Sequence, residues 1–479
     1  MRLVIANVVD AYRDNVALIR DPLLREHEVL DSYYIEDRAL LWHGDRKLVV
    51  TSLPVDAGHL RYLRRAMGYA QLENLAPREP TESLCEDILR EEGLRASIVE
   101  RLRGQGEVDL ISFVGSRGVL AVAEALRGAG LRVSTPECPS AECLEARDYL
   151  DSKAGFREFF RSAAGAIPGV QIPDGAVAQN PQEAAQLAVA FLQQGRACLC
   201  KPNNSQSGVG FVILRPGELA GGPAEWEEAI RSRLAGDRQM TSDVIVVEEL
   251  IEMDLSVAGG SPSIEMRIPA DPARDVEFMY LCGQILTAKG YFFGVEMHRD
   301  LVEPDLERTI ERAAVAVARE MRRRGYAGVF DMDMVAGVDG RLYAVEVNTR
   351  RTGGTHAHEA AEHLFGPRYW ERAAVISNNE LGFAGEPLTW GELQRLLSGL
   401  LWPIRGRKEG IIPSIISSLP SNRFGYVALA GDIGRARELV EQMHERLAAS
   451  GRRIRVFGEE GEAVPVAPAQ AVTAPAGAA

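Results

Sequence analysis

Two acidic segments flank an Asp-Gly pair at residues 339–340, and the spacing of their side chains suits metal chemistry. An Asp-Gly pair between strand-like runs is typical of a two-residue β-hairpin turn. Pairing outward from that turn places Asp333 opposite Glu346 and Asp331 opposite Asn348. Because side chains alternate along a strand, all four then lie on one face of the hairpin.

Carboxylates held opposite each other across a hairpin repel. At about 4 Å and an effective dielectric constant near 20, the repulsion is about 4 kcal/mol. The sequence therefore predicts a cation between Asp333 and Glu346, with Asn348 as a third oxygen ligand. Oxygen ligands without His or Cys suit Mg²⁺, which completes its shell with water and nucleotide phosphates. A solvated acidic hairpin without a metal is the alternative interpretation.

The run that follows, residues 349–356, combines two arginines with two glycines. The guanidinium groups of Arg350 and Arg351 can hold phosphate or carboxylate oxygens through forked hydrogen bonds. Gly353 and Gly354 allow backbone N–H groups to approach an anion closely. An ordinary surface turn would also accept these residues, but the position directly after the acidic strand favours a role in the site.

Length, composition and net charge limit the classes of protein to which this chain can belong. The chain has 479 residues, of which 46% are hydrophobic and 25% charged, and this predicts an ordinary water-soluble protein of two or three domains. No span reaches the roughly 20 apolar residues of a membrane helix, and the start does not fit a signal peptide. We therefore expect a cytoplasmic protein without a membrane partner. A net charge of −14 argues against binding nucleic acid. Six cysteines without a Cys-x-x-Cys spacing predict reduced thiols.

Element patterns divide the chain into three folded units and a tail. Residues 1–145 alternate strand and helix signals in the β-α-β manner. Residues 146–375 contain the acidic hairpin and two lysine-centred segments. Residues 376–462 predict a small α/β module with an amphipathic helix at 435–447. The Ala- and Pro-rich residues 463–479 predict a disordered tail.

Further segments of the second unit suit a nucleotide. A strand ending at Lys201 is followed by a polar loop, 203–210, that can fold over phosphates as a flap. A strand at 244–251 ends in paired acids that, with Asp254, can accept hydrogen bonds from adenine and ribose. Lys153 lies at a predicted helix start. Taken one by one, a generic hairpin loop, solvated acids and a surface lysine explain these segments equally well.

In combination, these residues resemble the ATP-grasp superfamily over roughly 146–360. The resemblance implies that Lys153 and Lys201 contact the α- and β-phosphates of ATP, that Glu248 holds adenine and that Asp254 meets the ribose. The implied cofactors are ATP and Mg²⁺. The implied nucleotide contacts are Lys153, Lys201, Ser205, Ser207, Gly208, Glu248, Glu249, Ile251 and Asp254, and the implied metal ligands are Asp333, Glu346 and Asn348.

The resemblance also implies a fold class. Residues 1–145 look like the domain that precedes the catalytic domain in this superfamily, so we expect an α/β (α+β) protein. It would have a Rossmann-like pre-ATP-grasp domain, a two-lobed ATP-grasp domain and a small C-terminal α/β module. The run 350–355 and the short C-terminal module are most similar to pheganomycin-type peptide ligases and related amino-acid ligases. Asp331 departs from the family pattern, and it would add an acidic contact to the metal or to a substrate amine.

The activity implied is that of an ATP-dependent carboxylate–amine ligase. It would form an amide or peptide bond through an acylphosphate, join amino acids or peptides in secondary metabolism, and take small-molecule carboxylate and amine substrates. Arg350 would steady the transferred phosphoryl group and the tetrahedral oxyanion, while Arg351 would position a substrate carboxylate. His356 would supply a polar contact or a proton relay. The implied substrate-binding residues are Gly353, Gly354, Thr355 and His356.

Other classes use the same residues. A small-molecule kinase would share the nucleotide machinery but release a stable phosphorylated product. A nucleotide-binding regulator without turnover would have no physical need for opposed carboxylates. A biotin-dependent carboxylase is disfavoured because the sequence contains no Met-Lys-Met biotinylation segment. The resembling enzymes make a homodimer a natural expectation.

Overall fold

The N-terminal domain is built on a five-stranded parallel sheet. The computed structural model of the protein describes residues 1–204, 210–287 and 290–455. The strand order of the first sheet is β3-β2-β1-β4-β5, which confirms the Rossmann-like prediction. Its strands are β1 (Arg2–Ile5), β2 (Lys47–Val50), β3 (Leu72–Leu75), β4 (Glu107–Ser112) and β5 (Arg132–Ser134). Its helices are α1 (Val8–Ala17), α2 (Pro22–Tyr34), η1 (Ile35–Leu41), α3 (Ala57–Met67), α4 (Leu84–Arg90), α5 (Glu92–Leu102) and α6 (Arg117–Gly128).

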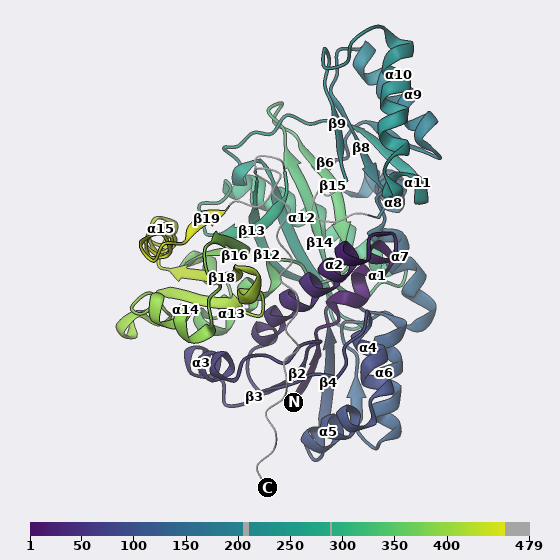
Figure 1. The fold of residues 1–479 in the computed structure, drawn as a ribbon. Coiled ribbons are helices and arrows are strands. Elements are labelled where there is room, and N and C mark those ends of the chain that lie inside the picture. The colour runs from purple at the N-terminus through teal and green to yellow at the C-terminus, as the bar shows by residue number, and fades with distance from the viewer. Residues whose placement is uncertain (205–209, 288–289, 456–479) are drawn as a thin grey trace.

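A small antiparallel sheet follows, and it forms the projecting lobe at the top right of Figure 1. Its strand order is β7-β10-β8-β9. The strands are β7 (Gly175–Ala178), β8 (Cys198–Pro202), β9 (Val212–Leu214) and β10 (Ile245–Glu249), with helices α9 (Pro181–Gln193), α10 (Pro223–Ala235) and α11 (Arg238–Ser242). The elements leading into this lobe are η2 (Ala141–Cys143), α7 (Leu144–Asp151), α8 (Lys153–Ala163) and η3 (Ala164–Ala166).

The third sheet is the largest and runs through the centre of the molecule. Its order is β17-β18-β16-β13-β12-β11-β14-β15-β6, with β19 beside β16. The strands are β6 (Val170–Gln171), β11 (Pro262–Ile268), β12 (Glu277–Leu286), β13 (Phe292–Met297), β14 (Gly328–Ala336), β15 (Leu342–Asn348), β16 (Ala374–Ala384), β17 (Gly410–Ile415), β18 (Arg423–Ala430) and β19 (Arg453–Arg455). The helical elements are η4 (Ala258–Gly260), α12 (Pro304–Arg323), α13 (Thr355–Phe365), η5 (Tyr369–Glu371), α14 (Trp390–Leu396), η6 (Ile404–Gly406), η7 (Leu419–Ser421) and α15 (Ile433–Ala449).

The C-terminal segment differs from the separate module that the sequence predicts. The expected boundary at 375/376 falls inside β16, which pairs with β13 on one side and β18 on the other. The strands after the boundary therefore extend the large sheet. The boundary at 145/146 likewise falls inside α7. The predicted helix at 435–447 is present as α15, and the predicted tail at 463–479 lies outside the described residues.

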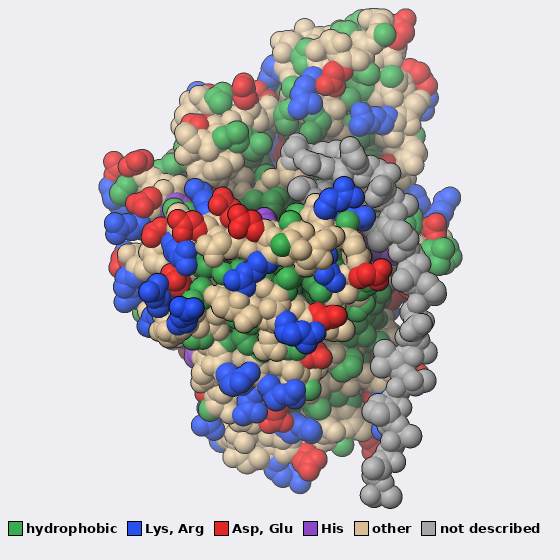
Figure 2. All heavy atoms as spheres, turned by 60° about the vertical axis from the view of Figure 1, so that its left-hand side comes forward, with side chains coloured by type: hydrophobic (Ala, Val, Ile, Leu, Met, Phe, Trp, Pro, Cys, Tyr) green, Lys and Arg blue, Asp and Glu red, His purple; other side chains and the backbone are tan. Residues whose placement is uncertain are grey.

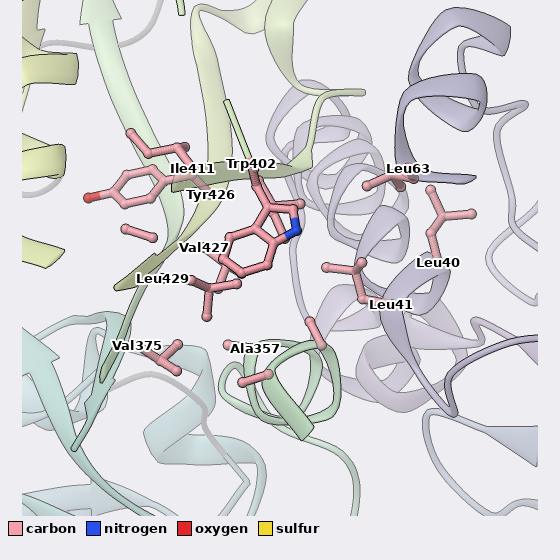
Figure 3. Close-up of a cluster of buried hydrophobic side chains, with 14 of the residues drawn as sticks. Leu40, Leu41, Leu63, Ala357, Val375, Trp402, Ile411, Tyr426, Val427 and Leu429 are labelled. Atoms are coloured by element: carbon pink, nitrogen blue, oxygen red, sulfur yellow. The ribbon is translucent and has the colours of Figure 1, made fainter. Parts of the chain in front are cut away.

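The largest core joins the first and last parts of the chain. Figure 3 shows Leu40 and Leu63 of the N-terminal domain facing Trp402 and Leu429 of the C-terminal segment, with Ala357 of α13 beneath them. Each fully buried Leu of this kind contributes about 1.5–3 kcal/mol relative to exposure. This core holds η1 and α13 in fixed positions relative to the large sheet.

The described residues show a surface of mixed charge and free thiols. On the face shown in Figure 2, Lys and Arg side chains lie among Asp and Glu side chains. Within residues 1–204, 210–287 and 290–455, no helix combines the length and the apolar character needed to cross a bilayer. All six cysteines are free thiols, and only Cys143 is not fully buried.

A buried carboxylate ties η1 to the C-terminal strands. Asp37 accepts hydrogen bonds from the backbone N–H groups of Ile416 and Ser417, both at 2.8 Å, and from the Ser417 hydroxyl at 2.9 Å. Burial raises the pKa of Asp37 to about 6, although these donors favour the ionised form. The contact spans 379 residues of sequence, so it fixes one domain against the other.

We expect D37A to destabilise the fold by about 2–4 kcal/mol, because two buried N–H groups lose their acceptor. Urea unfolding followed by circular dichroism measures this change. The exposed variant D300A is the matched control and should differ from wild type by less than about 0.5 kcal/mol. Equal stability of D37A and D300A would show that Asp37 does not hold the two segments together.

Candidate active site

The acidic hairpin has the predicted residue pairs, although its turn and its strand register differ from the prediction. Strands β14 and β15 place Asp331 opposite Asn348 and Asp333 opposite Glu346. The turn is longer than two residues, because Gly337 donates its N–H to the Arg341 carbonyl at 2.9 Å. A register shift next to Asp333 compensates for the extra residue. Two departures from a regular hairpin therefore cancel, and the predicted pairs are confirmed.

Hydrogen bonds and ion pairs join the hairpin side chains into one cluster. Lys153 Nζ lies 3.2 Å from Glu346 Oε1. Asn348 Nδ2 donates to Asp333 Oδ2 at 3.1 Å, and its own Oδ1 accepts from Arg350 Nη1 at 2.5 Å. The structure thus brings together five of the predicted residues from three places in the sequence.

The electrostatics of the cluster favour an added cation. Burial and the opposed carboxylate of Glu346 raise the pKa of Asp333 to about 6. Burial and Asp333 raise the pKa of Asp331 well above its usual range. Asp331 Oδ1 is buried and has no hydrogen-bond partner among the described residues. Within the described residues, no cluster of three or more His, Cys, Asp or Glu forms a metal site by itself. Two carboxylates and one amide oxygen instead suit Mg²⁺, whose remaining ligands come from water and phosphate.

Lys153 is positioned by the start of α8. The Ser152 hydroxyl caps this helix by accepting from the Gly155 N–H at 3.1 Å. The backbone N–H of Lys153 donates to the Asn203 carbonyl at 3.1 Å, and Ala154 N–H donates to Asn203 Oδ1 at 2.9 Å. These hydrogen bonds connect the start of α8 to the loop that follows β8. The second lysine, Lys201, lies in β8 itself.

Lys201 belongs to a separate buried ion cluster. Its ammonium pairs with Glu248, which also accepts from Arg157 Nη1 at 2.5 Å. Burial opposes ionisation of Glu248, but these two cations hold its pKa below the usual range. The Phe211 ring centroid lies 5.6 Å from Lys201 Nζ and 5.9 Å from Lys153 Nζ. The two lysines thus face one aromatic ring.

The residues predicted to contact adenine and ribose do not have their side chains clustered at one place. The Glu249 carboxylate pairs with Arg196 at 2.8 Å. Asp254 accepts from the N–H and hydroxyl of Ser256 at 3.0 and 2.6 Å, and these bonds lower its pKa. Ile251 is partly buried against Gly337. The flap residues Ser205, Ser207 and Gly208 lie outside the described residues.

The two adjacent arginines point in different directions. Arg350 lies over the Tyr12 ring, 5.7 Å from its centroid, and its Nη1 is 3.7 Å from Asp151 Oδ1. Tyr12 comes from α1 of the N-terminal domain. Arg350 therefore remains beside the acidic hairpin and faces the interface between the domains.

Arg351 turns away into a buried network. Its guanidinium pairs with Glu137 at 2.6 Å and with Glu359 at 3.1 Å, and Nη2 lies 2.7 Å from His43 Nε2. Arg267 joins through Glu137, also at 2.6 Å. Although burial opposes it, Arg351 helps to lower the pKa of Glu359 to about 2. The sequence prediction placed Arg351 at the substrate, whereas the structure engages it in contacts between domains.

The glycine run is tightly packed. A Cβ on Gly353 would lie 2.4 Å from Phe292, and a Cβ on Gly354 would lie 2.5 Å from the Tyr280 hydroxyl. The Thr355 hydroxyl donates to Glu265 Oε2 at 2.8 Å. His356 is fully buried, and in the part of the chain that the structure describes neither ring nitrogen has a hydrogen-bond partner. Gly353 and Gly354 thus permit a close turn, while His356 is the unsatisfied polar group of this run.

Several residues that face the hairpin from other elements are not predicted by the sequence. A cavity of about 380 Å³ is lined by Glu346 and Arg350 together with Tyr12, Asn15, Asp148 and Asp243. Asp151 accepts from the Thr349 N–H at 2.7 Å and orients the start of the arginine run. Its place two residues before Lys153 was a signal that could have identified it. No spacing could have connected Tyr12 to Arg350.

Comparisons with known proteins define the fold. Residues 36–127 match the family model described as the Pre ATP-grasp domain. No curated protein matches the sequence. Biotin carboxylase of Campylobacter jejuni, solved as a β-γ-ATP complex, is 14% identical, with 95% of this chain and 92% of that chain covered and a TM-score of 0.54.

Two other solved structures agree. The biotin carboxylase domain of the Hydrogenobacter thermophilus 2-oxoglutarate carboxylase is 13% identical, covers 95% of this chain and 90% of its own, and has a TM-score of 0.50. The N5-carboxyaminoimidazole synthase of Aspergillus clavatus is 11% identical, covers 94% and 98%, and has a TM-score of 0.52. The chain therefore has the ATP-grasp fold. Its N-terminal part is a pre-ATP-grasp domain over residues 36–127.

We expect the stability of D333N relative to wild type to rise as the pH increases from 4 to 7 without divalent cations. A folded-state pKa of about 6, against 3.8 in the unfolded chain, means that ionising Asp333 opposes folding. This contribution is absent below the lower value and complete above the higher one. The shift corresponds to about 3 kcal/mol at most.

Urea unfolding in EDTA at several pH values measures this difference. Addition of Mg²⁺ at pH 7 should stabilise wild type but not D333N, because the cation replaces the missing compensation. The exposed variant D300N controls for the loss of one negative charge. A pH-independent difference between D333N and wild type would contradict the assignment of repulsion at Asp333.

Proposed function

We propose that the protein is an ATP-dependent carboxylate–amine ligase. The observation that carries this proposal is the cluster in which Lys153, a carboxylate pair and Arg350 meet, with Lys153 Nζ 3.2 Å from Glu346. In such a cluster the lysine and the arginine can stabilise negative charge on a transferring phosphoryl group, and the carboxylates can hold a metal ion beside it. The ATP-grasp fold and the complexes of its solved neighbours with ATP or ADP support the same reading.

ATP and Mg²⁺ are the proposed cofactors. The metal would be held by Asp333, Glu346 and Asn348, whose side chains lie together on the hairpin. The raised pKa of Asp333 indicates that nearby cations only partly compensate the repulsion between the two carboxylates. When bound, Mg²⁺ neutralises charge on the transferring phosphoryl group. Lys153 and Lys201 would bind the nucleotide phosphates, together with the flap residues Ser205, Ser207 and Gly208.

The role of Glu248 is revised in this proposal. Both of its oxygens are engaged, by Lys201 and Arg157, so it positions Lys201 and is not free to accept a hydrogen bond from adenine. The backbone that follows, from Glu249 to Ile251, would then meet the adenine. Asp254 keeps the ribose role that was expected from the sequence.

The proposed reaction has two steps. A carboxylate oxygen attacks the γ-phosphorus of ATP, the bond to the bridging oxygen breaks, and an acylphosphate and ADP form. A neutral amine then attacks the acyl carbon, phosphate leaves, and the amine loses a proton to give the amide. Arg350 stabilises the negative charge on the phosphoryl group and on the tetrahedral oxyanion. Exclusion of water protects the acylphosphate.

The remaining arginine and the glycine run have supporting roles in this proposal. Arg351 fixes the start of the run by holding Glu137 and Glu359. Gly353 and Gly354 allow the close turn that leads into Thr355 and His356, both of which are fully buried. Amino acids or peptides are the proposed substrates, in line with the resemblance to pheganomycin-type ligases.

One other substrate class has support among the solved neighbours. The Hydrogenobacter thermophilus domain is a complex with bicarbonate. Bicarbonate is also a carboxylate that ATP can activate, so it belongs in the substrate screen as the acid component. A kinase would be distinguished by a stable phosphorylated product.

The test is ATP turnover with Mg²⁺ across a matrix of amino acids, short peptides and bicarbonate, with ADP, AMP and phosphate resolved and products identified by mass. ADP, phosphate and a dehydrated adduct, all requiring both an acid and an amine, would support the ligase. A stable phosphorylated product would establish a kinase instead, and AMP would overturn the acylphosphate route.

We expect E346Q to abolish turnover, with a loss of at least about 10³-fold, because it removes one metal-binding charge and the partner of Lys153. Far-ultraviolet circular dichroism should show an unchanged fold, since Glu346 is only partly buried. E386Q, in an exposed position away from the cluster, is the matched control and should retain wild-type rates. An E346Q variant with normal rates would refute the metal assignment.

A further inference from the structure

One arginine of the N-terminal domain is buried next to an aromatic ring. Arg38 lies in η1 and is only 5% exposed. Its Nε donates to the Ile35 carbonyl at 3.0 Å, and its guanidinium lies 5.9 Å from the centroid of the Phe113 ring. Among the described residues, no carboxylate lies within ion-pair distance of Arg38. Burying an unpaired cation is costly, so such a residue calls for an explanation.

The other fully buried arginines show what compensation looks like in this chain. Arg157 pairs with Glu248, and Arg351 pairs with Glu137 and Glu359. These residues are as buried as Arg38, yet each has at least one carboxylate within 3.1 Å. Among the buried arginines of the described residues, Arg38 therefore differs from Arg157 and Arg351 in having no carboxylate partner.

The acids next to Arg38 in the sequence face elsewhere. Glu36 accepts from the N–H and hydroxyl of Ser52, at 2.5 and 3.0 Å. Asp37 accepts from Ile416 and Ser417. Both carboxylates are therefore already hydrogen-bonded within the fold, and they do not neutralise the guanidinium.

Two packed aromatic rings connect Arg38 to Arg350. The Phe113 ring next to Arg38 lies 6.1 Å from the Tyr12 ring, and the Arg350 guanidinium lies 5.7 Å from the Tyr12 centroid. Burial, reinforced by the positive charge of Arg350, lowers the pKa of Arg38 to about 10, although Tyr12 and Tyr280 act in the opposite direction. Burial and the charge of Arg38 lower the pKa of His356 well below its usual range, so this ring is neutral. Of these two guanidinium groups, Arg350 has the Asp151 carboxylate at 3.7 Å, whereas the described residues offer Arg38 no carboxylate within ion-pair distance.

We propose that Arg38 and Arg350 together bind the carboxylate group of the acid substrate at the interface between the two domains. This inference rests on the proposed ligase function and names the part of the site that selects the acid. Arg350 is hydrogen-bonded to Asn348, one of the predicted metal ligands. A carboxylate held between the two arginines therefore lies beside the place where the phosphoryl group is transferred.

A carboxylate suits this region better than an ATP phosphate. The lysines expected to bind phosphates, Lys153 and Lys201, both lie near the Phe211 ring, and Lys153 pairs with Glu346. Arginine binds a planar carboxylate through a fork of two N–H groups. The aromatic rings of Tyr12 and Phe113 lie 6.1 Å apart beside the guanidiniums and provide a wall of low polarity.

The fold holds Arg38 firmly in this position. Leu40 and Leu41, in the same short helix, are buried in the core that joins the N-terminal domain to the C-terminal strands (Figure 3). Asp37 anchors the helix to Ile416 and Ser417. A preorganised guanidinium binds its anion without the cost of ordering a flexible side chain.

The test measures anion binding without ATP. Sodium N-acetylglycinate is the probe, and the uncharged N-acetylglycinamide, with sodium chloride at equal ionic strength, is its control. We expect the carboxylate to raise the melting temperature of wild type more than the amide does. In R38Q, the concentration needed for the same rise should increase at least about tenfold. R61Q, at an exposed position on α3, should behave as wild type.

A second variant guards against failure of R38Q to fold. R38K keeps the charge without the forked donors and should recover part of the carboxylate effect. Equal carboxylate stabilisation of wild type and R38Q, or of wild type and R38K if only that variant folds, would overturn the proposal. A rise with inorganic phosphate but not with N-acetylglycinate, lost in R38Q, would overturn the carboxylate assignment and make this a phosphoryl site.

Failure of the ligase function would be recognised separately. The binding experiment uses no nucleotide, so it can succeed even if no acid and amine pair supports ATP turnover. Once an acid substrate is known, R38Q should raise the KM for that acid at least about tenfold while leaving the KM for ATP unchanged. Equal increases in both values would show that Arg38 acts on the whole site and not on the acid.

Discussion

Repulsion between carboxylates on neighbouring strands is the constraint around which the site is built. Asp333 faces Glu346 across the hairpin, and Asp331 lies on the same strand two residues away. Burial strengthens this repulsion because water no longer screens it. The structure supplies partial compensation from Lys153 and Arg350, which come from other elements. The part of the charge that remains uncompensated is what makes a divalent cation a fitting ligand.

The same principle of charge compensation explains the buried arginines. Arg351 is neutralised by Glu137 and Glu359, and this network holds the arginine run against the N-terminal domain. Among the described residues Arg38 has no such partner, and the packed rings of Phe113 and Tyr12 connect it to Arg350 at the same interface. A fully paired cation serves the fold, whereas an unpaired one is available to a ligand. The distinction assigns different roles to residues of identical chemistry.

Continuity of the large sheet carries these contacts between domains. Strands β16 and β18 extend the sheet that contains the acidic hairpin, and β17, which pairs with β18, packs against η1 of the first domain. Asp37 adds hydrogen bonds across the same contact. The C-terminal segment is therefore part of the support of the active site, and the N-terminal domain is fixed closely enough to contribute side chains to it.

The sequence by itself determined what depends on local spacing. Alternation along a strand and an Asp-Gly turn were enough to pair Asp333 with Glu346, and the β-α-β pattern was enough for the first domain. The tertiary structure decided which way adjacent side chains point and what meets them. Arg350 and Arg351 are neighbours in the sequence, but Glu137 draws only one of them away. Tyr12 and Arg38 reach the site through packing between domains. Such contacts join residues hundreds of positions apart, so no local pattern encodes them.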